Sequence, residues 1–530
     1  MNLIAQLMEV DRFGERARLA CTGRRRADQI ECTKCAPLGS MPGRQMPSAR
    51  RQCLRPQRSL SHFSTSFRLR LNCASAQIIA SLSVALWAMA TDAAPVRVTA
   101  VPESVRREFN LATFYQKHVD VAGLPVVSST NVSDYALLEA AWIVRQMLTN
   151  RADILQALAS NHVRLAVMAY DEFTTDIPEH STLKPKVYWD RRARGLGATQ
   201  SRPAVSCAEE NLLCFPGDPY AAENILVHEF AHAVHEMSMT AIDPSFDLRL
   251  RSAFESAKKT GLWKGTYAGS NRSEYWAEGS QSWFDDNREN DASHNHVNTR
   301  AELIAYDPDL AKLCAEIYGN IPWRYQKPFR RAAPDRAYLA GYDPSNAPHF
   351  KWRVAPIPEQ PKVMIQTELG DIEVILEARR AQATVKNFLR YTAEGLYSDG
   401  LFHRTVTLQN QPSNSVKIEV IQASANPSRT NDFFPPIPIE RTRDTGLKHL
   451  DGTVSMARGE PNTAQDHFFI CLGDQPGLDF GGKRNPDGQG FAAFGRVSKG
   501  MDVVRKIHAS TASGQQLTPA IRIQLVVRLE

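Results

Sequence analysis

The stretch from Val227 to His232, VHEFAH, contains two histidines four positions apart with an acid between them. On a helix, residues four apart lie on the same face, so His228 and His232 can bind one metal ion together. Glu229 can then accept a proton from a water molecule whose pKa the metal lowers. The pattern predicts a zinc hydrolase site, although matches of this length also occur by chance in unrelated helices.

A third protein ligand must follow the two histidines. The metzincin class of zinc peptidases requires glycine at position 235 and histidine at position 238, whereas this chain has His235 and Ser238, which excludes that class. The gluzincin class takes a glutamate from a later helix, and Glu274 offers one in the sequence EYWAE. Glu278, one helical turn further on, can hydrogen-bond a ligand histidine.

The segment YAGSNRSEYWAE, residues 267–278, together with HEFAHAV, resembles the corresponding segments of anthrax lethal factor and its relatives. The resemblance covers roughly residues 205–320 and implies a helix-rich α+β zincin-like domain. The Zn²⁺ ligands that it implies are His228, His232 and Glu274, with Glu229 as the general base. It also implies that Tyr267 donates a hydrogen bond to the developing oxyanion or to the leaving amine.

Three other histidines lie close to these motifs. His235 falls on nearly the same helix face as His228, and we expect it to be a packed or hydrogen-bonded core residue. His294 and His296, in ASHNHVN, are expected to be solvated loop residues.

A second group of motifs runs from Val363 to Glu530. It begins with TVKNFLRYTAEGLYSDGLFHR (384–404) and continues with GTVSMARGEPNTAQDHFFICLGD (452–474), LDFGGK (478–483) and FAAFGRVSKGMDVVRKI (491–507). This segment resembles the cyclophilin family of peptidyl-prolyl isomerases over nearly its whole length. The resemblance implies a closed eight-stranded antiparallel β-barrel capped by helices. It also implies that the isomerase domain needs no cofactor.

The chemistry of such an isomerase can be derived from the amide bond. Rotation about an X-Pro bond must overcome a barrier of about 18–20 kcal/mol, with no covalent step. A catalyst therefore needs an apolar pocket for the proline ring and a fixed donor that favours the twisted amide. By match to the family the donor is Arg404, since arginine stays charged and rigid. The substrate-binding residues implied are Gln422, Phe469, Leu478 and Phe491.

This sequence departs from the family pattern in three places. The connection TVTLQNQPSNSVKIEVI between Arg404 and Gln422 is longer than usual, and Glu419 stands where the family has a phenylalanine. The tryptophan position associated with cyclosporin binding is Gly477. We therefore expect part of the pocket wall to be altered or supplied from elsewhere, and sensitivity to the drug to be weak.

The elements that must position these residues can be assigned from hydrophobic periodicity. Residues 134–160 and 221–240 are predicted to be helical, and residues 163–170 alternate as a strand. The Pro-, Gly- and Arg-rich stretch 175–220 is predicted to be a long loop. The sequence KVMIQTELGDIEVIL (362–376) predicts a β-hairpin turning at Gly370.

The N-terminal part carries a targeting pattern. Residues 1–70 contain 14 of the 63 basic residues but only 5 of the 57 acidic ones, so the remainder is nearly neutral and no nucleic-acid surface is expected. The apolar stretch AQIIASLSVALWAMA (76–90) follows arginines and predicts a signal peptide for export to the periplasm or beyond. If this signal is cleaved, the mature protein is expected to have no membrane span. The alternative is that the stretch stays uncleaved and anchors the protein in a membrane.

The predicted plan has five parts. Residues 1–75 are a basic leader, either unstructured or upstream of a mis-called start, and 76–94 are the signal and cleavage region. A zinc metallopeptidase-like domain (95–325), a Pro-rich linker or wrapping tail (326–360) and a cyclophilin-type domain (361–530) follow.

These observations favour an exported enzyme that acts on proline-containing polypeptides through isomerase and zinc metalloendopeptidase activities. The alternative is a secreted proline-peptide binding or chaperone protein whose metal-binding domain is not catalytic.

Overall fold

The computed structural model describes residues 96–291 and 293–529. The predicted leader, 1–75, and signal region, 76–94, lie outside the described residues. Within those ranges no helix combines the length and the apolar character needed to cross a membrane.

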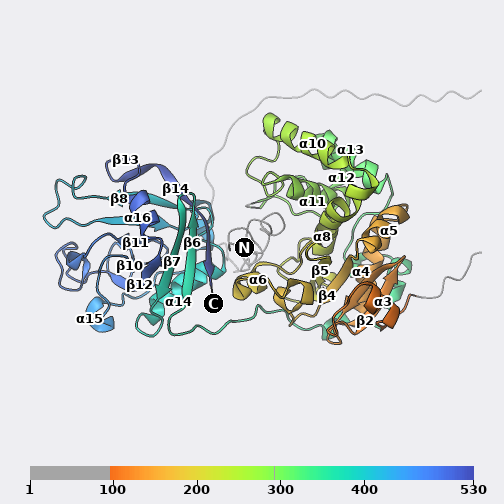
Figure 1. Cartoon of the computed structure of the whole chain (residues 1–530), viewed down its shortest axis with the longest axis horizontal. Coiled ribbons are helices and arrows are strands. Elements are labelled where there is room, and N and C mark those ends of the chain that lie inside the picture. The colour runs from red at the N-terminus through yellow and green to blue at the C-terminus, as the bar shows by residue number, and fades with distance from the viewer. Residues whose placement is uncertain (1–95, 292, 530) are drawn as a thin grey trace, which may run out of the picture. The chain divides into compact units, whose positions relative to one another are not determined.

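A five-stranded mixed sheet organises the first part of the chain, with the strands in sequence order (Figure 1). The first two pairings are antiparallel and the last two are parallel. All residues of the last three strands are buried, as expected where helices cover both faces of a sheet. The strands are β1 (Thr99–Ala100), β2 (Lys117–Val121), β3 (Leu124–Ser128), β4 (Arg164–Met168) and β5 (Ala204–Ala208).

Two helices confirm the periodicity predicted for residues 134–160. They are α4 (Asp134–Met147) and α5 (Ala152–Ser160), and each turns its apolar side chains into the core that covers the sheet. The short helix α3 (Glu103–Glu108) precedes them. The predicted strand over residues 163–170 is confirmed as β4.

A second helical group carries the histidine motif. Helix α8 contacts β5 on one side and α11 on the other, and α11 packs in turn on α13 (Figure 1). Thr299 begins α12 as part of a capping box, in which its side chain and that of Glu302 each accept the other's backbone N–H. The elements are α8 (Ile225–Ala233), a π-helical turn (Val234–Met239), α9 (Thr240–Ile242), α10 (Phe246–Thr260), α11 (Arg272–Trp283), α12 (Arg300–Tyr306) and α13 (Pro308–Tyr318).

The predicted long loop over residues 175–220 is wrong. This stretch contains α6 (Lys186–Arg192), the strand β5 and the short helix α7 (Glu209–Leu212). Strand β5, AVSCA, is buried along its whole length, so it shows no alternation of polar and apolar residues that would reveal a strand. Cys207 in this strand and nearby Cys214 are both free thiols.

The stretch predicted as a linker or tail, 326–360, packs on the first domain as far as Arg353, whose Nη2 lies 2.6 Å from Asp176 Oδ2. A buried ion pair holds it, because Arg331 Nη2 lies 2.6 Å from Glu139 Oε1. The hydroxyl of Tyr338 donates to the other oxygen of Glu139 at 2.6 Å. These contacts favour the wrapping-tail interpretation for this part, and the exact domain boundary stays a prediction.

The last part of the chain folds into a closed antiparallel barrel. Its eight strands follow the order β14-β6-β7-β12-β10-β11-β9-β8, and β14 pairs with β8 to close the ring, with the short β13 (Ala512–Ser513) attached to β14. The predicted hairpin is confirmed as β6 and β7. The strands are β6 (Lys362–Thr367), β7 (Gly370–Leu376), β8 (Gly400–Val406), β9 (Val420–Ser424), β10 (Thr453–Met456), β11 (Phe468–Cys471), β12 (Ala492–Lys499) and β14 (Gln516–Arg528).

Two helices cover the barrel and complete its core. Helix α14 (Gln382–Ala393) packs against β14 and β12, and α16 (Met501–His508) packs against β7, β8 and β9. Phe388 of α14 meets Phe468 and Phe494 inside the barrel. The short α15 (Thr442–Thr445) lies in a connection. The predicted eight-stranded barrel capped by helices is therefore confirmed.

We predict that Arg331→Met lowers the free energy of unfolding of the first domain by about 3–5 kcal/mol, because it leaves the carboxylate of Glu139 buried without its cation. Every tryptophan of the described residues lies before residue 353, so tryptophan fluorescence in urea reports this domain. Arg330→Met is the matched control, since that neighbouring side chain is exposed. Equal losses in the two variants would contradict the prediction.

Candidate functional site

Arg404 lies on β8 at the seam where the barrel closes. In the strand register it faces Gln422 of β9 on one side and Gln516 of β14 on the other. Its Nη1 donates to Gln422 Oε1 at 2.9 Å, and its Nε and Nη2 both donate to Gln515 Oε1, at 2.9 and 2.5 Å. Among the described residues no partner takes its remaining two N–H groups, so the guanidinium is fixed and still has donors for a substrate.

An apolar cluster adjoins this arginine. Phe469 of β11 pairs with Gln422 in the strand register and is 4% exposed. Its ring centroid lies 5.5 Å from that of Phe491, whose backbone N–H donates to the carbonyl of Leu478. The structure thus brings together all five residues predicted for the isomerase site: Arg404, Gln422, Phe469, Leu478 and Phe491.

The histidine motif forms a second, buried group of polar atoms. His228 Nε2 lies 3.0 Å from His232 Nε2 and 3.0 Å from Glu274 Oε2, and His232 Nε2 lies 3.5 Å from the same oxygen. All three side chains are fully buried. Burial acts to raise the pKa of Glu274, but the charge on His232 and hydrogen bonds with both histidines lower it to about 2.

Two helix starts and one cross-helix hydrogen bond fix this geometry. The side chain of Asn224 caps α8, and that of Asn271 caps α11 by accepting from the backbone N–H groups of Ser273 and Glu274. Trp276 Nε1 donates to the carbonyl of Ala231 at 2.9 Å and ties α11 to α8 beside the predicted ligand residues. The glutamate is therefore positioned by its own helix cap.

The three atoms fit a zinc ion. Nitrogen and oxygen ligands lie about 2.0–2.2 Å from zinc, so ligand atoms around a tetrahedral ion are about 3.3–3.6 Å apart, close to the separations seen here. Glu274 Oε1 is buried and accepts no hydrogen bond from any described residue. Two histidine nitrogens and a carboxylate that face one point form a donor set that a dication stabilises.

Glu229 and Tyr267 lie next to this group. A carboxylate oxygen of Glu229 falls within 4.8 Å of a ring nitrogen of His228 and of His232. The ring of Tyr267 lies 6.3 Å from that of His228, and its backbone N–H donates to the carbonyl of Ser293. All five residues predicted for the metallopeptidase site are thus close together.

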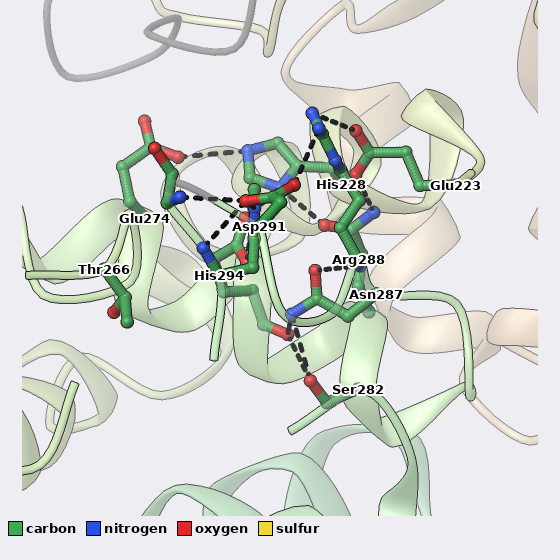
Figure 2. A network of polar contacts seen from close by, with 12 residues as sticks. Glu223, His228, Thr266, Glu274, Ser282, Asn287, Arg288, Asp291 and His294 are labelled. Atoms are coloured by element: carbon green, nitrogen blue, oxygen red, sulfur yellow. Dashed lines mark hydrogen bonds and ion pairs between the residues drawn. The ribbon is translucent and has the colours of Figure 1, made fainter. Parts of the chain in front are cut away.

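A network of polar side chains surrounds His228, as Figure 2 shows. The predicted partner of this histidine, Glu278, lies 3.8 Å from Nδ1, whereas Gln281 Oε1 lies 3.0 Å away and is its hydrogen-bond partner. Gln281 in turn donates to Glu223 at 3.0 Å. The prediction of Glu278 as the hydrogen-bond partner is wrong, and the partner is Gln281, which lies about one helical turn further along α11.

The solvated-loop prediction is wrong for His294. This side chain is 7% exposed, with Nδ1 2.7 Å from Asp291 Oδ1 and Nε2 3.5 Å from Glu278 Oε2. Asp291 also lies 2.6 Å from Arg288 Nη2 (Figure 2). His296 is exposed, as predicted. His235 is buried and pairs with Asp247 at 3.0 Å, which confirms its assignment to the core.

Comparison with known proteins identifies the barrel. The family model described as cyclophilin type peptidyl-prolyl cis-trans isomerase/CLD matches residues 362–527. Peptidyl-prolyl cis-trans isomerase A of Dickeya dadantii is 35% identical over 146 residues, which cover 27% of this chain and 70% of that protein. The chain belongs to the cyclophilin family.

A second curated relative agrees with this assignment. Peptidyl-prolyl cis-trans isomerase B of Escherichia coli is 36% identical over 146 residues, which cover 27% of this chain and 82% of that protein. A crystal structure of a cyclophilin type isomerase from Cryptosporidium parvum is 22% identical, with a TM-score of 0.27, and covers 32% of this chain and 98% of that chain.

The long connection between β8 and β9 contributes to the wall of the apolar pocket where the sequence departs from the family. Ile418 and Val420 both join the cluster of Phe469. Glu419 lies between them and immediately precedes β9. A Cβ atom at Gly477 would lie 2.6 Å from Val416 Cγ1, so the long connection fills the space above this glycine. The wall is supplied by the connection, as the sequence led us to expect.

Sequence reasoning missed two residues that hold the site side chains. Gln515 binds Arg404 only because β14 returns beside β8, more than 100 residues later, and no local pattern marks it. Gln281 had a usable signal, since it stands seven residues after Glu274 and therefore on the same helix face.

We predict that His294 makes the stability of the first domain depend on pH. Burial acts to lower the pKa of this histidine, but Glu278 and Asp291 raise it to about 9. The protonated ring therefore contributes stability that is complete below about pH 6.5 and is lost as the pH rises through about 9. In the presence of a chelator, the free energy of unfolding should fall over this range.

The variant His294→Gln should remove about 1–3 kcal/mol at pH 6 and flatten that pH dependence. The exposed His296→Gln is the control and should leave both unchanged. If the free energy of unfolding depends on pH in the same way in His294→Gln and in the unsubstituted protein, His294 is not the source of the pH dependence.

Proposed function

We propose that the barrel catalyses cis-trans isomerisation of X-Pro bonds in polypeptides. The observation that carries the proposal is the guanidinium of Arg404, which Gln422 and Gln515 hold beside the apolar cluster of Phe469. Family membership supports the same activity.

The proposed mechanism requires only binding and hydrogen bonding. The apolar cluster formed with Phe469 and Leu478 takes the proline ring, and Gln422 holds the substrate backbone. As the amide twists, its nitrogen regains a lone pair, and an N–H of Arg404 donates to it. Because its two glutamine partners already orient the guanidinium, little reorganisation is needed as the barrier is crossed.

We predict that Arg404→Ala in the full chain lowers kcat/KM for isomerisation of a short proline peptide by about 100-fold or more, because the donor to the twisted amide is lost. Arg505→Ala, an exposed arginine on α16, is the matched control and should keep full activity. A protein without activity before substitution, but with peptide affinity, would favour the alternative of a proline-peptide binding or chaperone protein.

We further propose that the first domain is a zinc-dependent metallopeptidase. The convergence of His228, His232 and Glu274 supports this proposal, as does the agreement of their separations with a zinc coordination sphere. Zinc, when bound, would lower the pKa of a water molecule toward neutrality and polarise a peptide carbonyl.

The chain's own residues supply the remaining steps. Glu229 would accept a proton from the attacking water and pass it to the leaving amine. Tyr267 would donate to the oxygen on which negative charge develops. Gln281 orients the ring of His228 through Nδ1.

We predict that the purified protein holds about one zinc ion per chain and that His228→Ala or Glu274→Gln loses it, as measured by atomic spectroscopy after dialysis. Glu229→Gln should keep the metal but lose peptide cleavage by about 100-fold or more. His296→Ala is the control histidine. Metal-free protein before any substitution would contradict the metal site, whereas bound zinc without cleavage would favour a non-catalytic metal-binding domain.

Export completes the proposed setting. The arginines and the apolar stretch at 76–90 support a signal peptide, and the substrates would then be exported proteins in the periplasm or outside the cell.

A further inference from the structure

The long connection between β8 and β9, residues 407–419, is organised around one buried side chain. Gln411 is 2% exposed, and its Nε2 donates to the carbonyl oxygens of Thr407 and Ile418 at 2.8 and 2.5 Å. Its Oε1 accepts from Arg484 Nη1 at 2.9 Å. The amide group of Gln411 therefore closes the connection and attaches it to the segment that carries Arg484.

Arg484 lies against the isomerase site. Its Nη1 also donates to the carbonyl of Val416 at 2.7 Å, and its backbone N–H donates to the carbonyl of Gly477, next to Leu478. The side chain is half-buried. Among the described residues only Nη1 of this guanidinium has hydrogen-bond partners, so the N–H groups on Nε and Nη2 are left for another acceptor.

The same connection also reaches Arg404. Gln515 Nε2 donates to the carbonyl of Asn410, while Gln515 Oε1 accepts from Arg404. Burial lowers the pKa of Arg484, and the positive charge of Arg404 lowers it further, which is consistent with two guanidinium groups that are close to each other. Both groups are tied to adjacent residues of one loop.

No acid of the described residues neutralises this pair, since no carboxylate oxygen lies within 4.0 Å of a nitrogen of either arginine. The two acids that flank Arg484 in its segment, Asp479 and Asp487, pair with other cations. Asp479 pairs with His449 at 2.8 Å and with Lys448 at 3.6 Å, and Asp487 pairs with Arg458 at 2.7 Å. The site thus presents two cations beside an apolar cluster.

We propose that Arg484 selects proline-containing segments with an aspartate or glutamate side chain near the proline, which it binds through its N–H groups on Nε and Nη2. The inference rests on the proposed isomerase function and names the substrate class of that site. While Arg404 acts on the amide, Arg484 binds the carboxylate, and arginine forms such pairs through two parallel hydrogen bonds. Arg484 is thus a specificity residue.

The test uses pairs of short peptides that differ only by glutamate or glutamine, with this residue placed in turn at each position from three before to three after the proline. The full-length protein should isomerise the glutamate member of at least one pair with a kcat/KM about two- to five-fold higher, the effect of a partly exposed ion pair. The preference should shrink at high salt, because ions screen the pair.

Variants separate charge recognition from loop structure. Arg484→Gln should abolish the preference, so that the glutamate and glutamine members of each pair are isomerised at equal rates, and Arg484→Lys should keep part of the preference. Lys386→Gln removes an exposed charge elsewhere on the barrel and should leave the preference unchanged.

Equal rates for every pair with the unsubstituted protein would overturn the inference while leaving the isomerase function intact. A uniform loss of activity on all peptides in Arg484→Gln, with the glutamate preference retained, would also overturn it and assign this arginine a structural role. Absence of activity on every peptide in the unsubstituted protein would instead overturn the proposed isomerase function.

Discussion

The pairing of β14 with β8 is the interaction on which the isomerase site depends. Without it the barrel would be an open sheet, and Arg404 would stand on an edge strand with one neighbour instead of two. Closure brings Gln515 to the guanidinium from one side, while β9 brings Gln422 from the other. The orientation of the proposed catalytic donor is thus a consequence of strand topology and needs no dedicated local motif.

The first domain obtains its geometry from helix packing. His228 and His232 share a face of α8 by helical periodicity alone. Glu274 joins them only because α11 packs on α8 at the level of these two histidines. The hydrogen bond from Trp276 to Ala231 and the Asn271 cap fix that level. Here a local sequence pattern supplies two of the proposed zinc ligands, and tertiary packing supplies the third.

This difference explains how much could be predicted from the sequence. The barrel was implied by the family resemblance of its motifs, whereas its hairpin and the helices α4 and α5 follow from periodicity that is visible locally. Strand β5 could not be predicted, because a strand buried on both faces has no alternation. His294 lies in a polar stretch, and its burial arises from packing against Glu278 of α11, which a local reading cannot show.

The two sites also differ in how their charges are balanced. In the histidine site the carboxylate of Glu274 lies buried among ring nitrogens, an arrangement that a bound cation or a protonated histidine must balance. In the barrel the cations Arg404 and Arg484 are only half-buried, and water can solvate them when no substrate is present. The zinc ion that we propose would balance the charge of the first arrangement. The arginines of the barrel need no resident counter-ion, so a charged group of the bound polypeptide can pair with them and determine specificity.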